Sequence, residues 1–153
     1  MLAIINIRLN MEIKNRKALF DYTVLESFTA GIMLTGPEVK SFRKGDCDLA
    51  DAYCIIENGE PFMKNCYFAE YKQGQHVEQN PRRDRKLLLN KREIERLKSA
   101  ISTKGLALPI LKIFINETGL IKALVGIAKG KKNYDKRQSI KDKDLRRESQ
   151  RQD

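Results

Sequence analysis

Stretches of apolar and β-branched residues alternate with polar breaks along this 153-residue chain, and the first long stretch covers residues 20–34. It is rich in Phe, Tyr, Thr, Val, Ile and Leu, which favour a β-strand. Gly31 lies inside the stretch and predicts a bend or a bulge at that point. A strand bent in this way is typical of a sheet that begins to curl into a barrel.

The segment after this strand carries the signals of a short helix. Pro37 stands at the first helical position, Glu38 adds an acid to the first turn, and Gly45 fits just beyond the end. We expect this helix to bury Val39 and Phe42.

A β-hairpin is predicted next, because apolar residues 52–57 and 61–68 flank Asn58 and Gly59. This Asn-Gly pair tolerates positive φ and is a strong turn signal. Residues 72–85 have no hydrophobic period and contain Gly, Pro and alternating charges, which predicts an exposed loop.

A longer helix is predicted to begin after Asn90, which can form a variant capping box with Glu93, and to end at Gly105. Its apolar positions recur along one face at Ile94, Leu97 and Ile101.

Residues 106–115 and 120–128 predict a final hairpin, with Pro109 placing part of its first strand at an edge or bulge. The order of elements lacks the long crossovers of a parallel sheet. We therefore expect a mainly β protein with short helices. The pattern alone leaves a small antiparallel barrel and an open α+β sheet as alternatives.

Composition points to a nucleic-acid partner. The chain has 30 Lys and Arg against 20 Asp and Glu, and its pI is near 9.6, which suits a polyanion better than a metabolite. A basic protein with no such partner is the simpler alternative. Half of the net charge of +10 lies in residues 129–153, which hold ten basic and five acidic residues.

These last residues have few large apolar side chains, namely Tyr134, Ile140 and Leu145. So little apolar surface cannot offset the entropy of ordering, so we expect the tail to be disordered when free. Its residues 140–148 contain no Pro or Gly, which favours a helix formed on binding.

The sequence does not support nucleotide binding, a zinc site or catalysis. The Gly126 to Gly130 spacing leaves three residues where a phosphate-binding loop needs four, and Lys132 replaces the hydroxyl that would hold magnesium. Cys47, Cys54 and Cys66 share no short spacing, and His76 does not complete a zinc site. We expect no enzyme activity, metal or cofactor. A hydrolase using Glu38 with a metal is a remote alternative.

No apolar run reaches the ~20 residues needed to cross a bilayer, and the start of the chain lacks the features of a signal peptide. We expect a cytoplasmic protein with no membrane partner.

Four motifs carry a family resemblance. Residues 126–137 closely resemble the Gly-Val-Ala-Lys-Gly-Lys-Lys-x-x-Asp-Lys-Arg run of the small protein B family, the SsrA-binding proteins of bacterial trans-translation, with Ile127 for Val. Residues 15–18, 36–45 and 80–90 resemble other motifs of that family, with Asn80 for the usual Asp and Asn90 at a position that is often His.

The resemblance implies an organisation and a fold. Residues 15–128 are expected to form an oligonucleotide-binding (OB) type closed β-barrel, and residues 129–153 a basic tail. Residues 1–14 are expected to be an N-terminal extension, with Met11 as an alternative start.

The implied function is that of a non-enzymatic adaptor. The barrel would bind the tRNA-like domain of tmRNA, and the tail would enter the empty decoding centre and mRNA channel of a stalled 70S ribosome. Elongation factor Tu is implied as part of the delivery complex. The alternative is a basic barrel protein that binds single-stranded or ribosomal RNA with no rescue role.

The resemblance also implies two sets of site residues. The tmRNA-binding set is Asn15, Arg16, Lys17, Glu38, Lys40, Ser41, Arg43, Arg85, Lys86, Leu88, Asn90 and Lys129. The decoding-centre set is Lys131, Lys132, Tyr134, Asp135, Lys136 and Arg137. From the residues alone, Glu38 is equally explained as a helix-start acid, and Asn90 as a helix cap.

Overall fold

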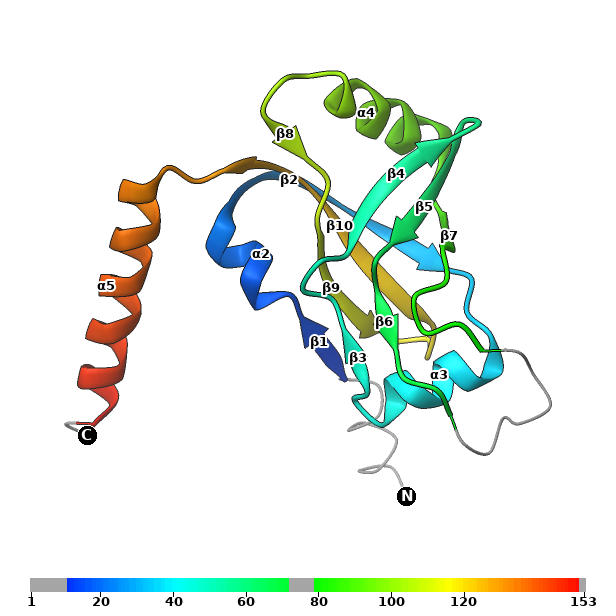
Figure 1. The fold of residues 1–153 in the computed structure, drawn as a ribbon, viewed down its shortest axis with the longest axis horizontal. Coiled ribbons are helices and arrows are strands. Elements are labelled where there is room, and N and C mark those ends of the chain that lie inside the picture. Colours follow the sequence, from blue (N-terminus) through cyan, green and yellow to red (C-terminus); the bar gives the residue numbers. More distant parts are fainter. Residues whose placement is uncertain (1–10, 72–78, 152–153) are drawn as a thin grey trace.

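The computed structural model of the protein describes residues 11–71 and 79–151, with the backbone alone at 133–135 and 151. A single antiparallel sheet path runs in the order β1-β9-β10-β2-β7-β5-β4 (Figure 1). Its strands are β1 Glu12–Lys14, β2 Tyr22–Ile32, β4 Tyr53–Glu57, β5 Glu60–Lys64, β7 Arg85–Leu88, β9 Ile110–Ile115 and β10 Ile121–Gly130.

Three short strands and four helices complete the described fold. Strand β8 (Leu106–Ala107) pairs with β10, and β3 (Cys47–Asp48) pairs with β6 (Tyr67–Phe68) in a separate two-stranded sheet. The helices are α2 Arg16–Asp21, α3 Gly36–Arg43, α4 Lys91–Ile101 and α5 Asn133–Arg151. The chain is therefore mainly β with short helices, as the sequence predicts.

The closed barrel predicted from the sequence is wrong, because the described sheet does not close. An isolated bridge between Tyr53 and Pro109 links β4 to the junction of β8 and β9. Two backbone hydrogen bonds flank it, from Cys54 N to Leu108 O at 2.8 Å and from Ile110 N to Ala52 O at 3.1 Å. Pro109 has no N–H to donate, so this contact does not extend into a strand ladder.

The core lies between the curled sheet and helices α3 and α4. Phe42 of α3 and Leu97 of α4 are fully buried, and they pack with inward-facing residues of the central strands. The strand residues of this core that have no exposure are Ala30, Met63, Ile110, Ile113, Ala123, Val125 and Ile127. Val39, which the sequence predicts to be buried, is half-buried, and Ile101 of α4 is 48% exposed.

Local turn and cap signals were predicted correctly. Asn58 and Gly59 both have positive φ, at 51° and 77°, in the turn between β4 and β5. Helix α4 begins with the expected capping box, in which Asn90 and Glu93 each accept a hydrogen bond from the other's backbone N–H. Gly105 follows this helix with a φ of 85°.

The predicted strand at residues 20–34 begins too early, because residues 16–21 form helix α2. Its bulge lies near Leu25, opposite Ile127 and Ala128 of β10, and not at Gly31. Gly31 instead pairs with Leu88 of β7, whose Cβ would lie 3.2 Å from an added Cβ. The glycine therefore permits a close approach of two strands.

The sheet extends beyond both predicted limits. Residues 12–14, which the sequence assigns to an extension, form β1 and pair with β9. Strand β10 continues through Lys129 and Gly130, which pair with Thr23 and Tyr22 of β2. Residues 1–10 lie outside the described part of the chain.

The tail forms a helix in the structure, where its composition predicts disorder. Helix α5 projects from the sheet beside α2 (Figure 1) and is longer than the predicted residues 140–148. Among the helices that the structure describes, none combines the length and the apolar character that crossing a bilayer requires.

The packing of Gly126 generates a stability prediction. A Cβ at this position would lie 2.9 Å from Cδ1 of the buried Leu111, whereas Gly130 on the same strand has no atom within 4 Å. We expect Gly126→Ala to lower the free energy of unfolding by about 1–3 kcal/mol through overpacking, and Gly130→Ala to leave it nearly unchanged. Urea denaturation measures both, and equal stability of the two variants would contradict the packing argument.

Candidate nucleic-acid interface

Glu38 lies at the start of α3 and is held by three donors. Its Oε1 accepts hydrogen bonds from the backbone N–H of Thr35 at 2.9 Å and from Arg83 Nη2 at 2.6 Å. Its Oε2 accepts a bond from Arg85 Nε at 2.6 Å. The Thr35 hydroxyl in turn accepts from the Glu38 N–H, which completes a capping box. The carboxylate is thus an anchor between α3 and the chain around β7.

Arg85 is a fully buried charged side chain at the start of β7. Besides Glu38, its guanidinium donates to the carbonyl oxygens of Cys66 at 2.6 Å and Pro81 at 3.0 Å. The ring of Phe68 lies 4.4 Å from the guanidinium carbon. Burial of this arginine is tolerated because its N–H donors have acceptors and its charge faces a carboxylate.

The ionisation of Glu38 reflects this environment. Burial alone raises the pKa of a carboxyl, but the hydrogen bonds from Arg83 and Thr35 and the charge of Arg85 outweigh it. The pKa of Glu38 therefore lies below its ordinary value of 4.5, and the side chain is ionised at neutral pH.

A groove of about 270 Å³ lies beside this anchor. Its walls come from β2, α3, β7 and the β9–β10 turn, and Arg43 and Leu88 are the predicted site residues among them. Leu88 is 52% exposed although it follows the buried Leu87, because alternate strand residues face opposite sides of a sheet. Asn90 is exposed just beyond β7, and Lys86 pairs with Glu60 at 3.2 Å.

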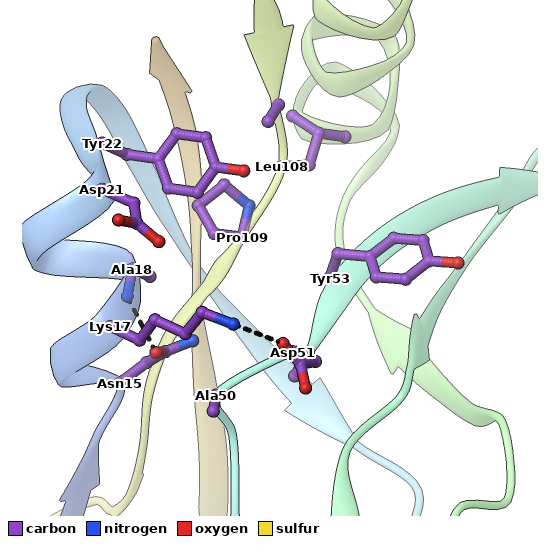
Figure 2. Close-up of a pocket in the computed structure, with 12 residues that line it drawn as sticks. Asn15, Lys17, Ala18, Asp21, Tyr22, Ala50, Asp51, Tyr53, Leu108 and Pro109 are labelled. Carbon is purple, nitrogen blue, oxygen red and sulfur yellow. Dashed lines mark hydrogen bonds and ion pairs between the residues drawn. The ribbon is translucent and has the colours of Figure 1, made fainter. Parts of the chain in front are cut away.

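A second group of predicted residues surrounds α2. The Asn15 side chain is buried: its amide donates to Leu49 O and Ile110 O, and its oxygen accepts from the Ala18 N–H. Lys17 extends from α2 across a hollow of about 410 Å³ to Asp51 at 2.9 Å (Figure 2). That hydrogen bond raises the pKa of Lys17 and lowers the pKa of Asp51. Arg16 is exposed beside them.

The predicted tail residues lie near the same helix. Lys131 donates its backbone N–H to Asp21 O at 2.8 Å, and Lys136 of α5 forms an ion pair with the Asp21 carboxylate at 3.4 Å. Lys129, Lys132 and Arg137 are exposed. The side chains of Tyr134 and Asp135 lie outside the described part of the structure.

The structure therefore brings many of the predicted residues together in two places. Four of the predicted residues are buried. Glu38, Arg43, Arg85 and Leu88 gather where α3 meets β7, while Arg16, Lys17 and the tail lie near α2. The four buried ones are Asn15, Glu38, Ser41 and Arg85. The Ser41 hydroxyl donates to Ala69 O.

Sequence reasoning missed a set of cations that rest on aromatic rings. Lys40 of α3 and its C-cap residue Lys44 both lie over Tyr71, and Arg82 lies over Tyr67. The ring of Tyr71 is 31 and 27 residues from these lysines, so no local pattern marks the contact.

Cys47 and Cys54 are unsuited to nucleophilic chemistry. Burial raises the pKa of Cys54 to about 12. The hydrogen bond between Cys47 and Cys66, whose Sγ atoms are 4.0 Å apart, and burial raise the pKa of Cys47 well above its usual 9.0. Thiols held in the protonated form react slowly. In the described residues, no cluster of three or more His, Cys, Asp or Glu side chains is arranged to hold a metal ion.

The Glu38 anchor generates a prediction about stability and its pH dependence. Glu38→Gln removes the negative charge that faces the buried Arg85, so we expect a loss of about 3 kcal/mol in the free energy of unfolding at pH 7. Glu60→Gln, which removes an exposed partner of Lys86, should change little.

The difference between wild type and Glu38→Gln should depend on pH in one direction. Above pH 4.5 the carboxylate is ionised in the folded and unfolded states, and its ion pairs stabilise the fold fully. Below this value the unfolded chain takes up the proton first, so the stabilisation falls and is lost as the pH passes through the lowered folded pKa. Urea denaturation at several pH values measures this. A gap that is the same at pH 7 and pH 3 would show that packing, and not charge, carries it.

Similarity to known proteins agrees with the resemblance in the motifs. The chain is 51% identical over 142 residues to the SsrA-binding protein of Parabacteroides distasonis, with 93% of each chain covered. It is 48% identical over 139 residues to the SsrA-binding protein of Bacteroides thetaiotaomicron, which covers 91% of this chain and 93% of that protein.

A solved structure described as "tmRNA-SmpB: a journey to the center of the bacterial ribosome" contains a similar chain. It has 46% sequence identity and a TM-score of 0.67, and the match covers 80% of this chain and 85% of that one. The family model for the SmpB protein matches residues 12–153. Because this match spans nearly the whole sequence and every described strand, the chain belongs to the SmpB protein family.

Proposed function

We propose that this protein is an RNA-binding adaptor that binds tmRNA and delivers it to stalled ribosomes for trans-translation. The observation that carries the proposal is the near full-length similarity, at about half of all positions, to proteins named for binding SsrA RNA. The solved tmRNA-SmpB structure supports the ribosome as the second partner. The chain itself makes and breaks no bond in this proposal, and it acts in the cytoplasm, where ribosomes are.

The groove beside Leu88 is the part of the surface that we assign to the tRNA-like domain of tmRNA. Leu88 and Asn90 are exposed there, and Arg43 adds a cation to the groove wall. Phosphate contacts from cations supply affinity, and an apolar side chain adds contact with an exposed base or ribose. Lys40 adds an exposed cation on α3, while Lys86, which is paired with Glu60, and Lys129, at the end of β10, are the further lysines of the proposed tmRNA-binding set.

The buried members of the predicted set support this surface from below. Glu38 and Arg85 fix α3 against β7, Ser41 ties α3 to Ala69, and Asn15 ties the start of α2 to Leu49 and Ile110. In our proposal these residues affect RNA binding by holding the exposed residues in place.

The tail has the second role. We propose that α5 and the two residues before it enter the empty decoding centre and mRNA channel, and that the contacts there come from Lys131, Lys132, Tyr134, Asp135, Lys136 and Arg137. Its charge suits a channel lined by RNA, and its helical form in the structure supports a rod that can follow such a channel. Elongation factor Tu completes the proposed delivery complex.

Competitive binding tests the proposal. We expect the protein to prefer tmRNA to a single-stranded RNA of equal length at ~0.2 M salt, where non-specific phosphate binding is weak. A variant that ends at Lys132 keeps β10 and the Lys131–Asp21 hydrogen bond whole, so it should keep this preference and lose tagging on stalled ribosomes. Equal binding of both RNAs would instead favour a general RNA-binding protein.

The site assignment has its own test. Leu88→Ala removes an exposed side chain, so it should leave the free energy of unfolding nearly unchanged and weaken tmRNA binding about tenfold, the effect of losing about 1.5 kcal/mol of apolar contact. Ile101→Ala is the control, because Ile101 is similarly exposed on α4 and does not line the groove. Equal affinities for tmRNA in these two variants would overturn the assignment.

A further inference from the structure

Lys40 of α3 and Lys44, the C-cap residue of that helix, share one aromatic ring. Lys40 Nζ lies 5.1 Å and Lys44 Nζ lies 4.8 Å from the ring centroid of Tyr71. Because each nitrogen is about 5 Å from the same point, the two are no more than about 10 Å apart. Both lysines are exposed, and Tyr71 is half-buried.

This arrangement differs from that of the other basic side chains near the site. Lys17, Lys86 and Lys112 are each within 3.3 Å of a carboxylate oxygen, which neutralises them locally. Within the described ranges 11–71 and 79–151, Lys40 and Lys44 have no carboxylate partner. An aromatic face attracts an ammonium group without cancelling its charge, so both cations stay available for an anion.

Lys40 and Lys44 lie four residues apart at the end of α3 and its C-cap, and like charges at this spacing repel each other. An anion between Lys40 and Lys44 would relieve that repulsion. The ring of Tyr71 holds both ammonium groups near one place before any anion arrives, which lowers the entropic cost of binding.

Tyr71 is itself fixed by hydrogen bonds on both sides. Its backbone N–H donates to Gln79 Oε1 at 2.7 Å, and its carbonyl accepts from Gln79 Nε2 at 3.0 Å. Two residues earlier, Ala69 accepts a hydrogen bond from the Ser41 hydroxyl of α3. The ring and the helix that carries the lysines are therefore parts of one connected platform.

A second contact between a cation and an aromatic ring lies close to Tyr71 in the sequence. Arg82 lies 5.6 Å from the ring centroid of Tyr67 and donates to Asn65 O at 3.3 Å. It likewise has no carboxylate within ion-pair distance among the described residues. Tyr67 and Tyr71 are four residues apart, so their Cα atoms are at most about 14 Å apart. Three cations that have no carboxylate within ion-pair distance among the described residues thus lie along a short path, although Arg82 still feels the charge of Asp51.

We propose that Lys40, Lys44, Tyr67, Tyr71 and Arg82, which we call the tyrosine surface, bind the phosphate backbone of an RNA strand. The three cations would contact phosphates, and the two tyrosines position them. This inference rests on the proposed function, because RNA is the polyanion that the protein is proposed to bind. It adds a contact outside the Leu88 groove: Val39 and Arg43 line that groove, whereas Lys40 and Lys44 lie on the next stripe, about 100° around α3.

The salt dependence of RNA binding tests the cations. The logarithm of the binding constant falls with the logarithm of salt concentration in proportion to the number of phosphates contacted. We expect the double variant Lys40→Gln, Lys44→Gln to reduce the slope for tmRNA by about 1.4–1.8, the loss of two phosphate contacts. The control is Lys112→Gln, which removes a lysine that also lies over a ring, 5.0 Å from that of Phe114, but is paired with Glu12. Its slope should not change.

The tyrosine is tested by substitutions that keep all charges. Tyr71→Leu should weaken tmRNA binding about threefold, and Tyr71→Phe, which keeps the ring, should restore wild-type affinity. Phe114→Leu is the matched control on β9, and we expect no change in affinity. If Tyr71→Leu also unfolds the protein, the salt slope of the lysine variant still decides the proposal.

The possible results distinguish failure of the tyrosine surface from failure of the proposed function. A normal salt slope in the lysine double variant would overturn the tyrosine surface, even if wild type prefers tmRNA. Failure of wild type to prefer tmRNA would overturn the proposed function, while a reduced slope on any RNA would still support the surface. Competition by poly-glutamate that depends on these two lysines, with no effect of the double variant on RNA, would assign the surface to an acidic protein and overturn the RNA assignment.

Discussion

The ion pair between Glu38 and Arg85 is the constraint on which the proposed RNA-binding surface depends. It joins the start of α3 to the start of β7, and Arg85 also binds the carbonyl oxygens of Cys66 and Pro81. Four chain segments are thereby held by one buried guanidinium. Because each charge is buried, neither is stable without the other. The position of α3, and with it the groove beside Leu88, follows from this pairing.

The basic residues outside the core are organised by their partners. Some lysines, such as Lys17 and Lys86, are held by carboxylates, which fix the side chain but cancel its charge. Lys40 and Lys44 are held by the ring of Tyr71, which fixes them and leaves the charge available. Lys136 of α5 is paired with Asp21 of α2, so an ion pair joins the tail to this helix. The net charge of +10 is thus divided between lysines that are paired with carboxylates and lysines that are not.

Features with a local cause were predicted from the sequence. The turn at Asn58 and Gly59 and the capping box at Asn90 each depend on the conformational preference of one or two residues. At Pro109 the sequence predicts an edge or bulge within one strand, whereas the structure divides that strand into β8 and β9. Strand β7 and helix α2 were missed. Residues 85–88 become a strand because β2 and β5 lie on either side, and α2 forms where buried Asn15 binds carbonyls 34 and 95 residues away.

The sequence by itself determined that the chain is mainly β, basic and similar to the SmpB family, because composition and contiguous motifs depend only on the order of residues along the chain. The tertiary structure alone decided that the sheet stays open at Pro109, that Glu38 and Arg85 face each other across 47 residues, and that Tyr71 lies beneath Lys40 and Lys44. The physical reason is sequence distance. Local preferences depend on neighbours along the chain, whereas a buried charge or an ordered cation depends on residues that only folding brings together.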